Sequence, residues 1–298
     1  MYIVRNTDIA IALALGAALL IAIGDVFQQR SAHEVTDEPV GHVGLLLRLL
    51  RDKEWWFGSL VATGGFGLQA AALGFGSVLL VQALLVTSML FALPLSARFA
   101  GRRITRSQVL WALALAAAIA VVVTVGNPAR GQSRAGIETW AWVLATLGPA
   151  LALCLFGARM FAGRPSAAVL LGLVSGSLWG VFAVLTVGVV DELDQGVWAV
   201  LTMPEVYGWA LVAVAATAVQ QSAFRAGSMA ASLPAVAVSE PLVGSILGVT
   251  VLQETFRPGE SGWLSLAGAF AVMVVAIVVL ARGEAVVEPA GNTSTKPA

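Results

Sequence analysis

Glu240 is the residue with the clearest capacity for chemistry, because its carboxylate lies near the middle of a long apolar block. A carboxylate in hydrocarbon is costly, so one that is retained there needs a partner, a water-filled cavity or a proton. Pro234 and Pro241 flank it, and because proline lacks an N–H, they predict a kinked or broken helix. Many transporters use such a helix with a midplane carboxylate to bind a cation, an amine or a proton. Ser239 joins this candidate site, and the alternative is a Glu that a hydrogen bond holds for packing alone.

Asp25 is a second carboxylate within an apolar block, close to the end of the block and just before Arg30. Its position fits either a ligand or gate residue of a solute pathway or an interfacial carboxylate that is solvated or paired with an arginine. A separate outward-facing acidic patch with no base nearby is predicted from Asp191, Glu192, Asp194 and Glu205.

Four further embedded side chains could line a solute pathway, namely Gln69, Trp179, Gln220 and Gln221. Gln69 and Gln220 are predicted to face each other between the two halves of the chain. Equally, the glutamines could form hydrogen bonds between helices without any ligand, and Trp179 could belong to the core.

The composition indicates a membrane protein. Of 298 residues, 58% are hydrophobic and 11% are charged, whereas a soluble domain carries about 25% charged residues. The 17 basic and 17 acidic residues balance, which argues against a nucleic-acid partner. Cys154 is the single cysteine, and His33 and His42 have no cysteine beside them, so these residues predict no metal site, and no cofactor is expected. Without a hydrolase triad, phosphate loop or HExxH pattern, no enzyme is predicted.

Nine apolar blocks are each long enough to cross a hydrocarbon layer of about 30 Å as a helix. They are Asp8–Gln28, Trp55–Phe75, Ser77–Ala97, Ser107–Val125, Thr139–Ala162, Ser166–Val187, Glu205–Phe224, Ala231–Leu252 and Ser261–Ala281. Nine crossings put four of the 17 Lys and Arg residues on one side and thirteen on the other. This bias predicts an extracytoplasmic N-terminus and a cytoplasmic C-terminus in a bacterial inner membrane. Residues 43–54 are predicted to lie along the inner surface, and residues 283–298 to be a disordered tail.

An internal repeat relates the two halves of the chain. Gln69 recurs as Gln220 at an offset of 151 residues, and several other polar and glycine positions share this offset. Five crossings separate the starts of the two copies, so the second copy (166–282) is predicted to be inverted relative to the first (8–125). The helix over 139–162 then connects them.

The predicted fold is therefore a single all-α transmembrane domain over residues 1–298, in which helices 1 to 4 form one repeat and helices 6 to 9 the inverted other. Two packings of such a bundle can be close in energy, which favours alternating access. The alternative is a duplication that merely built a large bundle. A row formed by Gly172, Gly176 and Gly180 permits either sliding or static close packing of a neighbouring helix.

Motif residues are spread over most of the chain: Ala223 to Ser228, Glu240, Pro241, Gly244, Gly248 and Glu254 in the second half, and Ala72, Gly76, Ser77 and residues 93–95 in the first. This set resembles the drug/metabolite transporter superfamily, particularly its EamA-type members. Those members usually have ten helices, and the nine-helix outline looks more like the NIPA magnesium-transporter branch. Gly101, Arg102 and Arg103 stand where the first family repeat would carry a glutamate. The resemblance implies gradient-driven transport of a small molecule.

Three functions fit these residues. The first is a secondary transporter of a small polar or cationic solute, with Glu240 as the titrating or coordinating group. The second is a NIPA-like magnesium permease, although magnesium prefers octahedral oxygen ligands and keeps several waters. The third is a non-transporting scaffold or lipid-handling partner of cell-envelope enzymes. The expected partners are a small-molecule or ion substrate and the lipid bilayer, and no oligomeric state is predicted.

Overall fold

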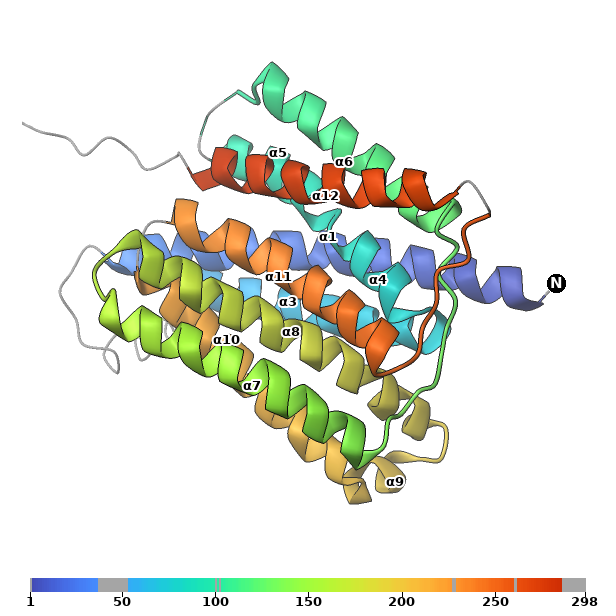
Figure 1. The fold of residues 1–298 in the computed structure, drawn as a ribbon. Helices are drawn as coiled ribbons and strands as arrows, with labels where there is room; N and C mark the ends of the chain where they lie inside the picture. Colours follow the sequence, from blue (N-terminus) through green and yellow to red (C-terminus); the bar gives the residue numbers. More distant parts are fainter. Residues whose placement is uncertain are drawn as a thin grey trace, which may run out of the picture.

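The computed structural model describes residues 2–36, 53–99, 101, 103–226, 229–259 and 262–285. Over these residues the protein is a bundle of helices (Figure 1). The helices are α1 (Tyr2–Thr36), α3 (Lys53–Phe75), α4 (Val78–Leu85), α5 (Ser88–Phe99), α6 (Arg106–Thr124), α7 (Ile137–Met160), α8 (Pro165–Leu193), α9 (Val197–Thr202), α10 (Pro204–Ala226), α11 (Met229–Thr250) and α12 (Gly262–Ala285). Each predicted apolar block overlaps one of these helices or the pair α4 and α5, so the all-α class is confirmed.

Six helical segments in the described parts of the chain are long and apolar enough to cross a membrane. They are Asn6–Gln28, Val78–Phe99, Arg106–Thr124, Ile137–Met160, Pro165–Leu193 and Gly262–Leu280. The remaining blocks correspond to α3, α10 and α11, of which α11 contributes a shorter apolar stretch, Ala235–Thr250. The count of nine crossings therefore stays a prediction.

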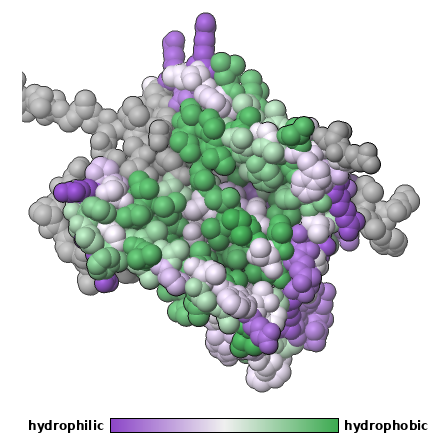
Figure 2. Space-filling view, in the orientation of Figure 1, coloured by the Kyte–Doolittle hydropathy of each residue, from purple (hydrophilic) through white to green (hydrophobic). Residues whose placement is uncertain are grey.

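Figure 2 is consistent with a membrane protein. Hydrophobic residues cover much of the face that it shows, and hydrophilic residues gather near its edges. Among them are the residues at the right-hand edge, where the loops lie in Figure 1.

Three predicted boundaries need correction or lie outside the described residues. Residues 188–204, which lie between two predicted apolar blocks, contain the end of α8 and the short helix α9. The predicted disordered tail begins too early, because α12 continues through Ala285, and residues 286–298 lie outside the described residues. Of the predicted surface segment, residues 43–52 also lie outside them, and α3 begins at Lys53.

The helix break occurs in the first half of the chain and not in the second. α11 continues through both of its prolines, whereas the block over Ser77–Ala97 divides into α4 and α5 at Val86 and Thr87. The N–H of Thr87 donates to the Leu84 carbonyl (2.9 Å), and the Thr87 hydroxyl donates to the same carbonyl (2.6 Å). A hydroxyl that competes for a helix carbonyl in this way favours a tighter turn and a local end of the helix.

Glycines bring two helix pairs into close contact. A Cβ on Gly24 of α1 would lie 2.8 Å from the Gly58 carbonyl oxygen of α3. On α8, a Cβ on Gly180 would lie 2.9 Å from the Glu240 carbonyl oxygen of α11, and one on Gly176 would lie 3.0 Å from the Glu240 nitrogen. Both pairs therefore pack backbone against backbone, as small residues permit in membrane helices.

The contacts between helices follow a paired pattern. α1 packs on α3 and on the α4–α5 pair, while α8 packs on α10 and on α11. α6 and α12 lie side by side, and α7 lies at the periphery against α8 (Figure 1). The repeat that relates the two halves, with α7 as connector, stays a prediction, and so does its in-plane two-fold axis.

Candidate solute-binding site

A cavity of about 60 Å³ lies between α1, the α4–α5 break and α11. One water needs about 10–15 Å³ of such space, so the cavity can hold several waters or a small solute. Its wall includes Ile21 of α1, Gln82 of α4, Ser88 and Met89 of α5, and Glu240 and Pro241 of α11. Most of the remaining wall is aliphatic, which makes its few polar groups the determinants of what can bind.

Glu240 reaches this wall because α11 continues through Pro241 at that point. The side chain is half-buried, so its carboxyl borders the cavity instead of being sealed in the core. On the other side of α11, Gly176 and Gly180 of α8 hold the backbone at Glu240. The small residues of α8 therefore fix the depth at which this carboxyl lies.

Gln82 is a polar residue of the cavity that the sequence analysis missed. It is 1% exposed, and neither its Nε2 nor its Oε1 has a hydrogen-bond partner among the residues that the structure describes. Gly244 of α11 makes room for it, because a Cβ there would lie 2.6 Å from Gln82 Nε2. An unpaired buried amide costs about 1–3 kcal/mol. The available signal was a lone glutamine in the apolar run VLLVQALL.

Asp25 lies one helical turn after Ile21, on the same face of α1 that reaches the cavity. It is half-buried, and its carboxyl is near enough to Glu240 for the two groups to interact electrostatically. The structure therefore brings together two acidic residues that are 215 positions apart in the sequence. Two carboxyl groups in an environment of low dielectric repel each other strongly when both are ionised.

Trp179 and Gln220 belong to an aromatic cluster between α3, α8 and α10. The Trp179 ring stacks on Phe66 (4.7 Å between centroids), and its Nε1 donates to Gln220 Oε1 at 2.8 Å. Phe182 continues the cluster edge-on to Trp179. The cavity wall does not include Trp179 or Gln220, and they fill the core of the bundle.

The other predicted site residues also lie away from the cavity wall. Gln69 is 2% exposed in the buried stripe of α3, and its Oε1 has no partner within the described residues. Gln220 bonds to Trp179, and no hydrogen bond between Gln69 and Gln220 is found in the described structure. Ser239 donates to the Ala235 carbonyl of its own helix at 2.7 Å. Gln221 is half-buried on α10.

At the end of the bundle where α6 and α11 terminate, two loops run side by side (Figure 1). We call these two segments, residues 126–134 and 251–257, the clasp. The Ala129 N–H donates to the Thr255 carbonyl (2.9 Å), and the Gln132 N–H donates to the Leu252 carbonyl (2.7 Å). A Cβ on Gly131 would collide with the Leu252 carbonyl oxygen, so only glycine permits this approach. The clasp thus joins the ends of α6 and α11.

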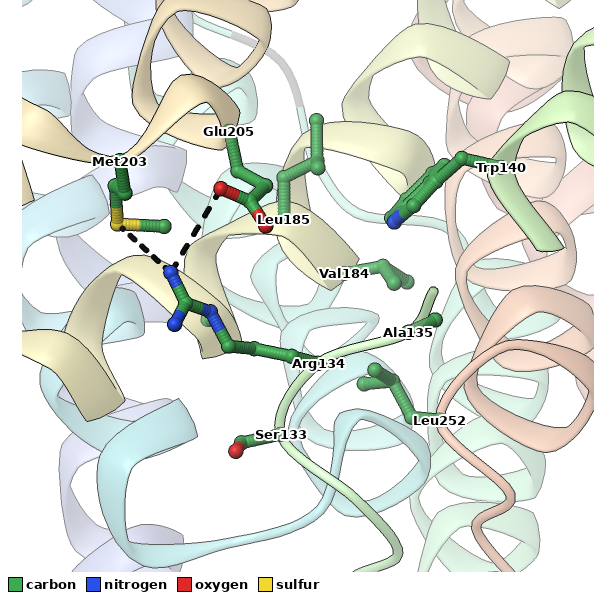
Figure 3. Close-up of a pocket in the computed structure, with 10 residues that line it drawn as sticks. Ser133, Arg134, Ala135, Trp140, Val184, Leu185, Met203, Glu205 and Leu252 are labelled. Carbon is green, nitrogen blue, oxygen red and sulfur yellow. Dashed lines mark hydrogen bonds and ion pairs between the residues drawn. The ribbon is translucent and has the colours of Figure 1, made fainter. Parts of the chain in front are cut away.

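Arg134, at the end of the first clasp segment, lines a small pocket (Figure 3). Its Nη1 lies 2.8 Å from Glu192 Oε2, and its Nη2 lies 3.7 Å from Glu205 Oε2 and 3.5 Å from the Met203 sulfur. The pocket retains about 10 Å³, barely the space of one water. The prediction of an acidic patch without a base nearby is therefore wrong, because the loop over 126–136 brings Arg134 to it.

Glu254 of the clasp binds the N-terminus of α4. Its Oε1 accepts the Val78 N–H at 2.6 Å, and its Oε2 accepts the Leu79 N–H at 2.9 Å. The residue is 3% exposed. Burial raises the pKa of the Glu254 carboxyl above its ordinary value, while the two N–H donors and the positive charge of Arg130 act in the opposite direction.

Comparison with known proteins identifies one relative over the full length of the chain. An uncharacterized protein of Corynebacterium glutamicum is 36% identical over 295 residues, which cover 99% of this chain and 98% of the relative. This chain belongs to the same family as that protein. No family model matches the chain, and no solved structure matches it. Membership of the drug/metabolite transporter superfamily stays a prediction.

The matched region covers nearly the whole chain, and therefore both the cavity and the clasp lie within the architecture that the two family members share. Chemically, the cavity wall offers the Glu240 carboxyl and the Gln82 carboxamide among aliphatic side chains, and the Asp25 carboxyl interacts electrostatically with that of Glu240. Such a set can accept hydrogen bonds from a cation and compensate its charge. It contains no thiol or imidazole ligand within the described residues, and no group of three or more His, Cys, Asp or Glu side chains there could hold a metal ion.

Proposed function

We propose that this protein is a secondary membrane transporter that moves a small, positively charged solute by alternating access. The observation that carries the proposal is a cavity whose wall includes Gln82 of α4 and Glu240 of α11, with Asp25 of α1 near enough to interact electrostatically with Glu240. The proposal assigns no chemical reaction to the chain. It includes the orientation expected from the basic residues, with the N-terminus outside a bacterial inner membrane and the C-terminus inside.

The charge of the solute follows from the two carboxyl groups. When Asp25 and Glu240 are both ionised, a bound cation relieves their repulsion, and the aliphatic wall strengthens this attraction by excluding water. The Gln82 amide, which has no partner in the described residues, can complete the coordination of the solute through Oε1. Among the described residues of the cavity wall, an anion would find no basic side chain to pair with.

Transport accounts for these features better than a scaffold role does. Both polar atoms of the Gln82 amide lack a partner among the described residues, and because this amide borders the cavity, a bound solute can offset the cost in stability, which a scaffold role leaves without a benefit. The paired helix contacts of the two halves also fit a bundle with two packings of similar energy.

An organic ammonium ion is favoured over magnesium as the solute. Magnesium requires near-octahedral oxygen coordination and retains several waters. The cavity instead combines few oxygen ligands with the aliphatic side chains of Leu85, Val86 and Met89. Ammonium N–H groups pair with carboxylates, and short alkyl groups fit an aliphatic wall.

Flux measurements with the purified full-length chain in proteoliposomes test the proposal. The probes are radiolabelled methylammonium, tetramethylammonium and putrescine, with magnesium followed by an indicator dye. We expect uptake of at least one ammonium probe above that of empty liposomes. Glu240→Gln and Asp25→Asn should each reduce it by about tenfold or more, because each removes one charge-assisted contact.

The matched control is Glu138→Gln, which neutralises an exposed acid in the first turn of α7 and should transport like the wild type. Uptake of magnesium without any ammonium probe would support the magnesium permease instead. Folded wild-type protein that moves none of the probes would overturn the proposal and favour the scaffold.

A further inference from the structure

Helix α4 is short, and its position depends on what holds its two ends. All eight of its residues are buried. It begins after the turn at Gly76 and Ser77 and ends at the break before Thr87. Gln82 lies one helical turn after Val78, so a shift or rotation of α4 moves the Gln82 carboxamide directly. The C-terminal end of α4 passes through the turn at Val86 and Thr87 into α5, whereas its N-terminal end follows the turn at Gly76 and Ser77, where α3 has ended.

The carboxylate of Glu254 holds the N-terminal end of α4 in place. It binds the N–H groups of both Val78 and Leu79, and it does so from the second half of the chain. Ser77 adds only a local cap, because its Oγ accepts the Leu80 N–H at 3.1 Å. The two contacts of Glu254 therefore tie the start of α4 to an element that is distant in the sequence.

The segment that carries Glu254 is itself held by backbone contacts. Gln253 has a φ of 56°, which turns the chain sharply after α11. The Glu254 N–H then donates to the Gly248 carbonyl at 2.9 Å, and Thr255 pairs with Ala129 of the facing loop. A Cβ on Gly248 would lie 3.0 Å from Glu254 Oε2, so this glycine leaves room for the carboxylate.

We propose that Glu254 is a positioning residue of the solute site, which sets the depth and orientation of the Gln82 carboxamide through α4. This inference rests on the proposed function, because it assumes that Gln82 contacts the solute. Glu254 itself does not reach the cavity wall. Its effect on solute affinity must therefore pass through Gln82. A cap with only a structural role would affect transport independently of Gln82.

A double-mutant cycle on solute affinity separates these two roles. The measurement is the KM and the maximal rate for the ammonium probe that the wild type transports best. Glu254→Gln keeps one acceptor but turns an NH₂ group toward the second N–H of α4. We expect Glu254→Gln and Gln82→Leu each to raise KM by about tenfold, and the double variant to raise it no further than the larger single effect. Two effects that multiply would overturn the inference.

Two further variants sharpen the cycle. Glu254→Asp keeps the charge and should restore part of the affinity that Glu254→Gln loses. Glu192→Gln removes an acid that pairs with Arg134 at the same end of the bundle but does not touch α4. Because Glu192 does not act through Gln82, the fold-changes in KM caused by Glu192→Gln and by Gln82→Leu should multiply in the double variant.

Hydrogen exchange of the α4 amides gives a readout that does not require transport. Loss of the cap in Glu254→Gln should make exchange of the peptide over 78–85 faster by about tenfold or more. Unchanged exchange would overturn the positioning role. If the wild type transports none of the probes, the proposed function fails, and the exchange result still decides whether Glu254 holds α4.

Discussion

The clasp and the cavity differ in how their polar side chains are satisfied. In the clasp, Arg134 lies 2.8 Å from Glu192, and Glu254 accepts two backbone N–H groups. In the cavity, the Gln82 amide has no partner among the described residues, and the Glu240 carboxyl has another carboxyl, that of Asp25, as its electrostatic neighbour. The two regions are joined by one helix, α4, which begins at the clasp and ends at the cavity.

This difference separates polar groups that stabilise the fold from polar groups that lower its stability. A buried donor or acceptor contributes to stability only when it is paired, and it costs free energy when it is not. In the described residues, unpaired buried amide atoms belong to Gln82, which borders the cavity, and to Gln69, which does not. The same kind of substitution should therefore have opposite consequences in the two regions.

The largest effect is expected when the same change, Glu to Gln, is made in each region. Glu254→Gln leaves one N–H of α4 without an acceptor and should lower the free energy of unfolding by about 1–3 kcal/mol. Glu240→Gln removes a negative charge that is repelled by Asp25. It should therefore raise the free energy of unfolding or change it by less than about 0.5 kcal/mol. Thermal unfolding of both variants in the same detergent measures the difference. A Glu240→Gln variant that unfolds as easily as Glu254→Gln would remove the distinction between the regions.

A somewhat smaller effect is expected for Gln82→Leu. Leucine has a similar size and no polar atoms, so it should raise the free energy of unfolding by about 1 kcal/mol while solute uptake falls. The matched control is Gln108→Leu on α6. Gln108 is also buried, but its side chain accepts the Thr105 N–H at 2.9 Å in a capping box, so the same substitution should be destabilising by about 1 kcal/mol. Destabilisation by Gln82→Leu would show that the amide has a partner in the folded protein.

The helices could be predicted from the sequence, because length and hydropathy alone determine where a helix can cross a membrane. Each apolar block overlaps a helix or the pair α4 and α5. The position of the helix break could not be predicted from proline alone. α11 tolerates Pro234 and Pro241, whereas the first half breaks at Thr87, whose hydroxyl competes for a helix carbonyl.

The site was predictable only in part. Asp25 and Glu240 could be found because a carboxylate within an apolar block is conspicuous. Their electrostatic interaction depends on how α1 and α11 each pack on α4, which no local pattern contains. Gln69, Gln220 and Gln82 are similar as sequence signals, and only tertiary contacts separate the residue in the cavity wall from those in the core. The pairing of Glu254 with α4 spans 176 positions and has no local signal either.

The smallest expected effect is the pH dependence of the contribution of Glu254, which sharpens the account of the clasp. Its pKa in the folded protein is raised above the ordinary value of 4.5, so the folded state binds the proton more tightly than the unfolded state does. Its contribution to stability is therefore complete below pH 4.5 and is lost as the pH rises through the raised pKa. Glu254→Gln cannot titrate, so the gap in melting temperature between the wild type and this variant should narrow from about pH 4 to about pH 8. A gap that widens instead would mean that the two N–H donors and Arg130 outweigh burial. The carboxylate would then be fully compensated in the clasp, and the contrast with the uncompensated pair in the cavity would be larger than the structure indicates.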